Sequence, residues 1–265
     1  MRTALARLVE RLEDDALSVA NVIPWSSPVP CFGDPSLSRV ATLGLNPSNR
    51  EFVDGAGKEL DGDLRRFHTL KSLGLSGWAD ATARHVQMIV DSCRVYFSRN
   101  PYDGWFRKLD YLISGTEASY YAGLSSACHL DLIPYATACK WTELTLKQRS
   151  FLVSASGNTL GHLLCDSEIQ VLILNGNSVV RHFQDMAKVE LEAQVMPQWA
   201  LPRRQHSGVT GIAYKGLVQE VSGVKLDRDL LVLGFNHNIQ SSFGVTNKVT
   251  GAIRRWITRA ATAHL

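Results

Sequence analysis

Residues 39–49, RVATLGLNPSN, contain the local pattern from which we predict the fold of this chain. Residues 39–44 are mostly apolar, and residues 45–49 contain the Asn, Pro and Ser that favour a turn. A short apolar run bounded by turn residues is typical of a buried strand. The stretch therefore predicts a buried strand over 39–44 and a loop at its carboxyl end.

Three further apolar runs have the same character, at residues 128–134, 169–176 and 230–236. Helical patterns lie between and after them, with apolar residues at helical spacing within 86–97 and 249–257. Short buried strands that alternate with helices favour a parallel sheet. We therefore predict an α/β fold, a three-layer α/β/α arrangement around a central, mostly parallel sheet of four strands.

Two segments lie outside this pattern. Residues 1–20 carry apolar side chains at helical spacing among acidic and basic ones, which predicts an amphipathic helix and excludes a signal peptide. Residues 191–229 are less regular and hold several prolines and glycines, so we expect a hairpin insertion over the edge of the sheet. We expect a single domain over residues 1–265.

The composition excludes several classes of protein. Of the 265 residues, 45% are hydrophobic and 20% are charged, which is normal for a globular chain with a substantial core. No apolar run approaches the roughly 20 residues that span a bilayer, so we expect no membrane partner. The net charge of +3 allows a nucleic-acid partner without requiring one.

The five cysteines are scattered singly along the chain, and no CxxC pair occurs. This pattern argues against a disulfide framework and a structural zinc site. We expect reduced thiols in a cytoplasmic protein, with no metal and no cofactor.

Polar residues follow each predicted strand, at Asn46, Asp131, Asn175 and Asn236. Ligands of open α/β sheets bind at the carboxyl ends of the strands. Although each residue alone is explained by the preference of Asn and Asp for turns, four at one rim predict a binding cleft there.

Four motifs follow one another along the chain: GLNPS at 44–48, RRFHTL at 65–70, DLIPYAT at 131–137 and GFNHNIQSS at 234–242. This order resembles the uracil-DNA glycosylase superfamily, nearest its mismatch-specific and thymine-type branches. The resemblance covers roughly residues 40–260, with a few motif residues in each part. It implies an enzyme that flips a nucleotide out of the duplex and cuts its glycosidic bond without a metal.

The resemblance implies two catalytic residues. Asn46 matches the residue that positions the attacking water, and its structural alternative is an ordinary turn Asn. His237 most nearly matches the histidine that donates to the base O2 and stabilises the departing anion, although the prolines of that motif are missing here. Asn236 competes for the same role, and a buried structural histidine is the alternative.

Three further residues are expected to bind the base. Ser48 stands where the uracil-specific branch has a large aromatic residue, so the pocket is open at the pyrimidine 5-position, unless Ser48 only caps a turn. Phe52 matches an aromatic residue that stacks on the flipped base, with a core position as the alternative. Asp131 replaces a base-reading Asn, and because a carboxylate only accepts, it suits the N4 amine of cytosine. The alternative is an Asp131 that caps a turn or pairs with an Arg.

Contacts to DNA are expected from two segments. Within the insertion, basic side chains are candidates to track the phosphate backbone, and the loop after residue 236 offers a wedge and phosphate contacts. The expected DNA-binding residues are Arg203, Arg204, Ile239, Gln240, Ser241 and Ser242. Four tryptophans are candidates to line a sugar-sized pocket, with ordinary core packing as the alternative: Trp25, Trp105, Trp141 and Trp199.

With these residues, the resemblance implies a monofunctional DNA glycosylase. The small Ser48 and the acidic Asp131 favour a 5-modified cytosine, hydroxymethylated or glucosylated, as in phage DNA, and hence a role in defence. Alternatives are a repair glycosylase for uracil or mismatched thymine, a non-catalytic DNA-binding module, and a small-molecule enzyme that uses the same cleft. DNA is the expected partner, and no obligate protein partner is predicted.

Overall fold

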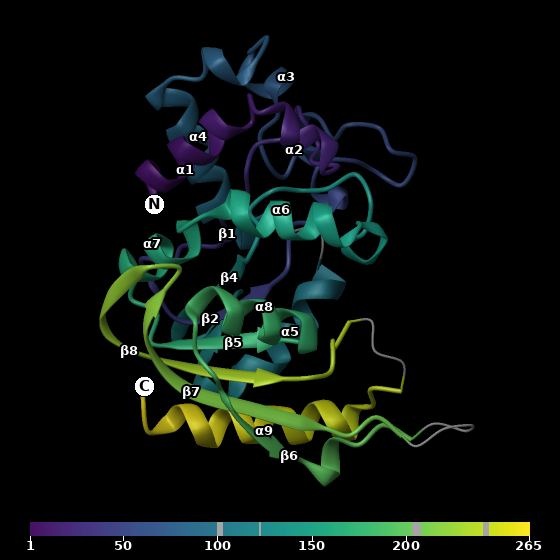
Figure 1. Ribbon diagram of the computed structural model, residues 1–265, viewed down its shortest axis with the longest axis vertical. Helices are drawn as coiled ribbons and strands as arrows, with labels where there is room; N and C mark the ends of the chain where they lie inside the picture. The colour runs from purple at the N-terminus through teal and green to yellow at the C-terminus, as the bar shows by residue number, and fades with distance from the viewer. Residues whose placement is uncertain (100–102, 122, 203–207, 241–243) are drawn as a thin grey trace.

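The computed structural model describes residues 1–265 except 100–102, 122, 203–207 and 241–243. Among the described residues, the chain forms a mixed sheet of eight strands (Figure 1). The strands are β1 (Cys31–Phe32), β2 (Ser38–Gly44), β3 (Ala118–Ser119), β4 (Ser125–Asp131), β5 (Val171–Asn175), β6 (Glu192–Val195), β7 (Ile212–Val221) and β8 (Val224–Phe235). Their order is β1-β4-β2-β5-β8-β7-β6, and β3 pairs with β4.

The four strands predicted from apolar runs are β2, β4, β5 and β8, and they are neighbours in the sheet. The pairs β4–β2, β2–β5 and β5–β8 are all parallel, so the α/β class is confirmed. The prediction of only four strands was wrong. Of the additional strands, β1 and β3 are two residues long, β6 is exposed, and β7 mixes buried with exposed residues, so none of them produces a long apolar run.

The insertion at 191–229 widens the sheet at its edge. Strands β6 and β7 pair antiparallel, and β7 pairs antiparallel with β8 in a long hairpin. The hairpin turns at Ser222 and Gly223, whose φ angles are 52° and 78°. Two consecutive positive φ angles are typical of the turn that best matches the twist of paired strands. The expected hairpin is therefore present, and it includes the first half of β8.

The N-terminal segment forms two helices, α1 (Arg2–Arg11) and α2 (Asp15–Val19), where we expected a single helix over 1–20. The break occurs at Asp14, whose side chain accepts a hydrogen bond from the Ala16 amide and so begins a new helix. Helix α1 buries Leu5, Leu8 and Val9, as its apolar spacing predicts.

The remaining α-helices are α3 (Leu70–Leu73), α4 (Ala83–Arg94), α5 (Asp103–Ile113), α6 (Leu146–Ser156), α7 (Thr159–Cys165), α8 (Asn177–Ala187) and α9 (Asn247–Thr262). The short 3₁₀ helices are η1 (Asn49–Glu51), η2 (Gly62–Leu64), η3 (Trp78–Asp80), η4 (Tyr96–Ser98), η5 (Ser114–Thr116), η6 (Trp141–Glu143) and η7 (Pro197–Trp199). In the motif at 65–70 only the last residue belongs to an α-helix, because α3 starts at Leu70 and Thr69 caps it.

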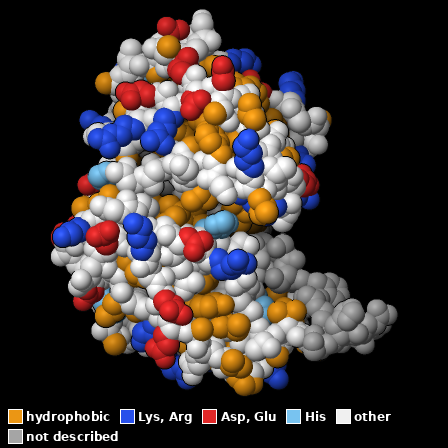
Figure 2. All heavy atoms as spheres, viewed as in Figure 1, with side chains coloured by type: hydrophobic (Ala, Val, Ile, Leu, Met, Phe, Trp, Pro, Cys, Tyr) orange, Lys and Arg blue, Asp and Glu red, His pale blue; other side chains and the backbone are white. Residues whose placement is uncertain are grey.

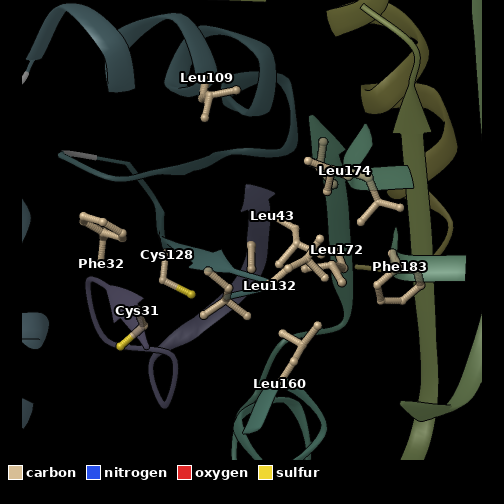
Figure 3. Packing of buried hydrophobic residues seen from close by; sticks show 14 of the residues in the cluster. Cys31, Phe32, Leu43, Leu109, Cys128, Leu132, Leu160, Leu172, Leu174 and Phe183 are labelled. Atoms are coloured by element: carbon tan, nitrogen blue, oxygen red, sulfur yellow. The ribbon is translucent and has the colours of Figure 1, made fainter. Parts of the chain in front are cut away.

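Figure 1 shows α1, α2 and α4 gathered at one end of the molecule and α9 at the other, with the sheet between them. Helix α1 contacts α4 and α7, and α9 contacts both α5 and β8. The core joins the sheet to these helices. In Figure 3, side chains such as Leu43 of β2 and Leu172 of β5 lie in one cluster with Leu109 of α5 and Phe183 of α8.

The structure also shows whether the described residues include a membrane-spanning helix, a metal-binding group or a disulfide. Within the described ranges, no helix combines the length and the apolar character that crossing a membrane requires. The same residues contain no group of three or more His, Cys, Asp or Glu side chains placed to hold a metal ion. All five cysteines are free, and Cys31, Cys93 and Cys128 are buried.

Candidate functional site

Two adjoining pockets lie where β2, β4 and β5 end. The inner pocket has a volume of about 160 Å³, and its lining includes Asn46, Glu51, Trp105, His129 and Asp131. The outer basin has a volume of about 500 Å³, and its lining includes Asn46, Trp105, Trp141, Asn175 and Asn238. The loop 44–48 and Trp105 line both spaces. The cleft therefore lies at the carboxyl ends of the parallel strands, where we expected it.

Asn46 stands at the junction of the inner pocket and the outer basin. Its Nδ2 donates to Thr137 Oγ1 at 3.0 Å and faces the carbonyl oxygens of Pro47 at 3.2 Å and Tyr135 at 3.4 Å. Thr137 Oγ1 donates in turn to the Cys139 carbonyl at 2.8 Å, so it is an acceptor toward Asn46. Because three acceptors surround Nδ2, the amide has one favourable orientation, in which Oδ1 is left to accept from a water or a ligand.

Asp131 ends β4 and lies in the inner pocket, with 5% of its surface exposed. Its Oδ1 is 3.4 Å from His129 Nε2, and His129 Nδ1 is 2.6 Å from Thr42 Oγ1. The Thr42 hydroxyl also bonds to the hydroxyl of Tyr120. With a proton on each hydroxyl and on Nε2, these residues form an ordered row of hydrogen bonds. Tyr120 donates to Thr42, Thr42 donates to His129, and His129 donates to the Asp131 carboxylate.

Glu51 is a site residue that sequence reasoning missed. It ends η1, lines the inner pocket, and has only 3% of its surface exposed. The Tyr96 hydroxyl lies 3.1 Å from Oε1 and 3.0 Å from Oε2, and the Arg66 guanidinium lies 3.5 Å from Oε2. Burial raises the pKa of Glu51 to about 7, although Arg66 and Tyr96 act in the opposite direction. No periodic signal marks it, because a buried acid in a three-residue turn looks like any surface acid in sequence.

Trp105 supplies the aromatic face that both spaces share. Its ring makes edge contacts with Phe106, at 4.7 Å between centroids, and with His129, at 5.3 Å. Of the four tryptophans considered for a sugar-sized pocket, Trp105 and Trp141 line the outer basin. Trp199 is fully buried in the core instead.

Phe52 does not have the position expected of a residue that stacks on a base. It is buried to 1% exposure and packs edge-on against Trp25 and obliquely against Phe67. In the described part of the chain, the residues that line the two pockets do not include it. We correct the expectation accordingly: Phe52 is a core residue, and Trp105 is the candidate for stacking.

Ser48 lines both the inner pocket and the outer basin and is exposed. Its Oγ accepts from the Arg50 amide at 3.2 Å and caps η1. The capping role is therefore present, and the same serine lines both spaces; an opening for a pyrimidine 5-substituent stays a prediction.

His237 and Asn236 hold backbone instead of facing the cleft, which corrects their expected roles. His237 is buried, and its Nε2 is 2.7 Å from the Trp199 carbonyl oxygen. Asn236 Oδ1 accepts from the Ile212 amide at 2.9 Å, and its Nδ2 donates to the Thr210 carbonyl at 2.7 Å. In the described part of the chain, neither residue lines the two pockets, whereas Asn238 of the same loop lines the outer basin.

Gln240 connects the loop after β8 to the site by hydrogen bonds. Its Oε1 accepts from Asn175 Nδ2 at 2.8 Å, and its Nε2 lies 3.4 Å from the Trp105 carbonyl oxygen. Ile239 is buried, so in this conformation it is no exposed wedge. Four of the expected DNA contacts, Arg203, Arg204, Ser241 and Ser242, lie outside the described residues.

The comparisons with known proteins add no family to this picture. No protein-family model matches the chain, and no curated protein is significantly similar to it in sequence.

Proposed function

We propose that the chain is a monofunctional DNA glycosylase that excises a pyrimidine, a cytosine with a 5-substituent, and leaves an abasic site. One observation carries the proposal: an acidic inner pocket joins a larger basin at Asn46. A cavity of ~150 Å³ accommodates a benzene ring, so the inner pocket, at about 160 Å³, has room for one six-membered ring. The proposal includes helices on both faces of the parallel strands and a cytoplasmic location.

The reaction follows from this placement. With the base in the inner pocket and the sugar in the outer basin, the glycosidic bond lies near Asn46, whose Oδ1 orients a water toward the sugar C1′. The bond from C1′ to N1 breaks, and its electron pair leaves with the base. The water oxygen bonds to C1′, and the water proton neutralises the departing base. Trp105 stacks on the ring and contributes about 1–3 kcal/mol to its binding.

The substrate class rests on Asp131 and Ser48. The Asp131 carboxylate lines the inner pocket, where it accepts from an exocyclic amine and repels a carbonyl such as the O4 of uracil. Ser48 leaves the mouth of the pocket open toward the outer basin, which has room for a hydroxymethyl group or a sugar on the 5-position. An enzyme with this preference attacks modified phage DNA and spares unmodified host DNA.

Base release from a matched panel of oligonucleotides tests the proposal. The panel contains uracil, mismatched thymine, cytosine, 5-hydroxymethylcytosine and its glucosylated form, each in single strands and duplexes. We expect release from the modified cytosines only, and a loss of that release of about 10²-fold in Asn46→Ala, the range typical of a lost catalytic group. Asp131→Asn should lose modified cytosines and gain uracil.

Two variants at exposed positions serve as controls: Asn158→Ala, at the start of α7, and Asp227→Asn, in β8. Both should release base as the wild type does. Release of uracil alone by the wild type would make the chain a repair glycosylase. Salt-sensitive binding of every duplex without release would favour a non-catalytic module, and the absence of DNA binding would favour a small-molecule enzyme.

A further inference from the structure

The inner pocket is lined by two buried carboxyl groups that come from different elements. Asp131 ends β4, and Glu51 ends η1. Two ionised carboxylates in one pocket of this size repel each other, so one of them is favoured as the neutral acid. The negative charge of Asp131 raises the pKa of Glu51, in addition to the larger effect of its burial.

The surroundings of the two groups show which one keeps the proton. Asp131 faces His129 Nε2, a donor in the ordered row described above. Glu51 Oε2 is 3.0 Å from the Tyr96 hydroxyl and 3.5 Å from Arg66, whereas Oε1 is near the same hydroxyl at 3.1 Å. Because one hydroxyl has one proton to donate and the ion pair with Arg66 is made by Oε2, Oε1 is the favoured site for a proton.

We propose that Glu51, as a neutral carboxylic acid, donates a hydrogen bond to the ring nitrogen of the bound base, while Asp131 accepts from its exocyclic amine. This inference rests on the proposed function and adds a second specificity-determining residue to it. Cytosine presents an N4 amine donor beside the N3 acceptor and matches both carboxyl groups. Uracil presents a carbonyl and an N3–H donor, so it mismatches both.

The arrangement makes base release depend on one proton. The groups that face Glu51 are Tyr96 from η4, Arg66 from the segment before α3, and Asp131 from β4. As pH rises above about 7, Glu51 ionises and loses the proton that the ring nitrogen needs. We expect release of 5-hydroxymethylcytosine to fall about tenfold for each pH unit above that value.

The variant Glu51→Gln separates this role from a structural one. Its amide nitrogen donates at every pH, so the alkaline fall should disappear while release near pH 6 stays within a few-fold of wild type. Glu192→Gln, at an exposed position of β6, is the matched control and should keep the fall. Thermal unfolding of each variant shows whether it is folded.

The test measures single-turnover release from a 5-hydroxymethylcytosine duplex between pH 6 and 9 at constant ionic strength. An alkaline fall in the wild type and in Glu192→Gln that is absent from Glu51→Gln supports the proposal. A flat wild-type profile, or an equal fall in Glu51→Gln, overturns the role of Glu51 and leaves the glycosylase assignment intact.

A second measurement is calorimetric titration of the wild type with free 5-hydroxymethylcytosine and free uracil at pH 6 and 9. Tighter binding of the cytosine at pH 6, lost at pH 9, supports the role of Glu51 independently of turnover. Equal affinity for both bases at both pH values overturns it. If no duplex releases base at any pH, the proposed function itself fails, and this binding experiment alone decides what Glu51 does.

Discussion

At the scale of single residues, Gly44 allows the inner pocket to exist. A Cβ atom at this position would lie 2.4 Å from Asp131 Oδ1 and 2.9 Å from His129 Nε2, closer than real contacts allow. Glycine at the end of β2 therefore lets the side chains at the end of β4 face the cleft.

The variant Gly44→Ala should displace the Asp131 carboxylate. We expect the free energy of unfolding to fall by about 1–3 kcal/mol, as for other overpacked sites, and release of modified cytosine to fall with it. Urea unfolding and the release assay measure the two effects. Gly104→Ala in α5 is the control, because a Cβ there meets nothing within 4 Å. Wild-type stability and activity in Gly44→Ala would contradict this account of the pocket.

The Tyr96 hydroxyl offers a second residue-scale prediction. It hydrogen-bonds to the Glu51 carboxyl and lowers the pKa of that group. Tyr96→Phe should therefore raise the pKa of Glu51 and move the alkaline fall of base release to higher pH. The measurement is the same pH profile, with Tyr111→Phe, a half-exposed position on α5, as the control. An unchanged midpoint would show that another group titrates.

At the scale of elements, the hairpin of β7 and β8 widens the parallel sheet. Its turn places Ser222 at a φ of 52°, a conformation that disfavours residues with a side chain. The Ser222 hydroxyl is also buried and, among the described residues, has no hydrogen-bond partner.

Ser222→Gly should therefore stabilise the protein, by about 1 kcal/mol, because glycine adopts a positive φ without steric penalty. Thermal or urea unfolding measures the change. Gly223→Ala, at a φ of 78°, is the opposite test and should destabilise. Since the turn lies outside the residues that line the two pockets, base release should be unchanged in both variants; a loss of release would mean that the hairpin affects the site.

At the scale of the whole molecule, the two signs of charge are nearly balanced, with 28 Lys and Arg against 25 Asp and Glu. Figure 2 shows acidic and basic side chains interspersed across the visible face, so this face does not present one continuous basic surface. The net charge of +3 is correspondingly small. In the proposed function, the base is recognised in the cleft at the strand ends.

Global stability should depend on pH through Glu51. Its pKa rises from an ordinary 4.5 to about 7 on folding, so its contribution to stability is fully present below pH 4.5 and is lost as pH rises through 7. The loss is about 3 kcal/mol at most, from 1.36 kcal/mol per pKa unit. Glu51→Gln should lack this loss and become relatively more stable than the wild type above pH 7.

Urea unfolding of both proteins between pH 4.5 and 8 measures the difference. The two free energies of unfolding are subtracted because His68 also makes stability depend on pH. Burial lowers the pKa of His68 to about 4, so its effect on stability becomes more favourable as pH rises, equally in both proteins. A difference that stays constant over this range would show that folding does not perturb Glu51.

The amino-acid sequence alone predicted the four central strands and the rim at which they end. Apolar runs such as 39–44 and 169–176 are local signals of burial. Because the carboxyl ends of parallel strands meet at one edge of the sheet, we expected Asn46, Asp131 and Asn175 to line one cleft, as they do. These features depend on short stretches of chain, so short stretches are enough to predict them.

Only the tertiary structure showed which polar residues face that cleft. Glu51 and Trp105 enter the inner pocket, whereas Phe52 turns into the core and His237 binds a backbone carbonyl. The direction of each side chain depends on partners distant in sequence, such as Tyr96 for Glu51 and Trp199 for His237. A local sequence pattern does not predict those partners, because they are set by the packing of segments that are remote in the sequence.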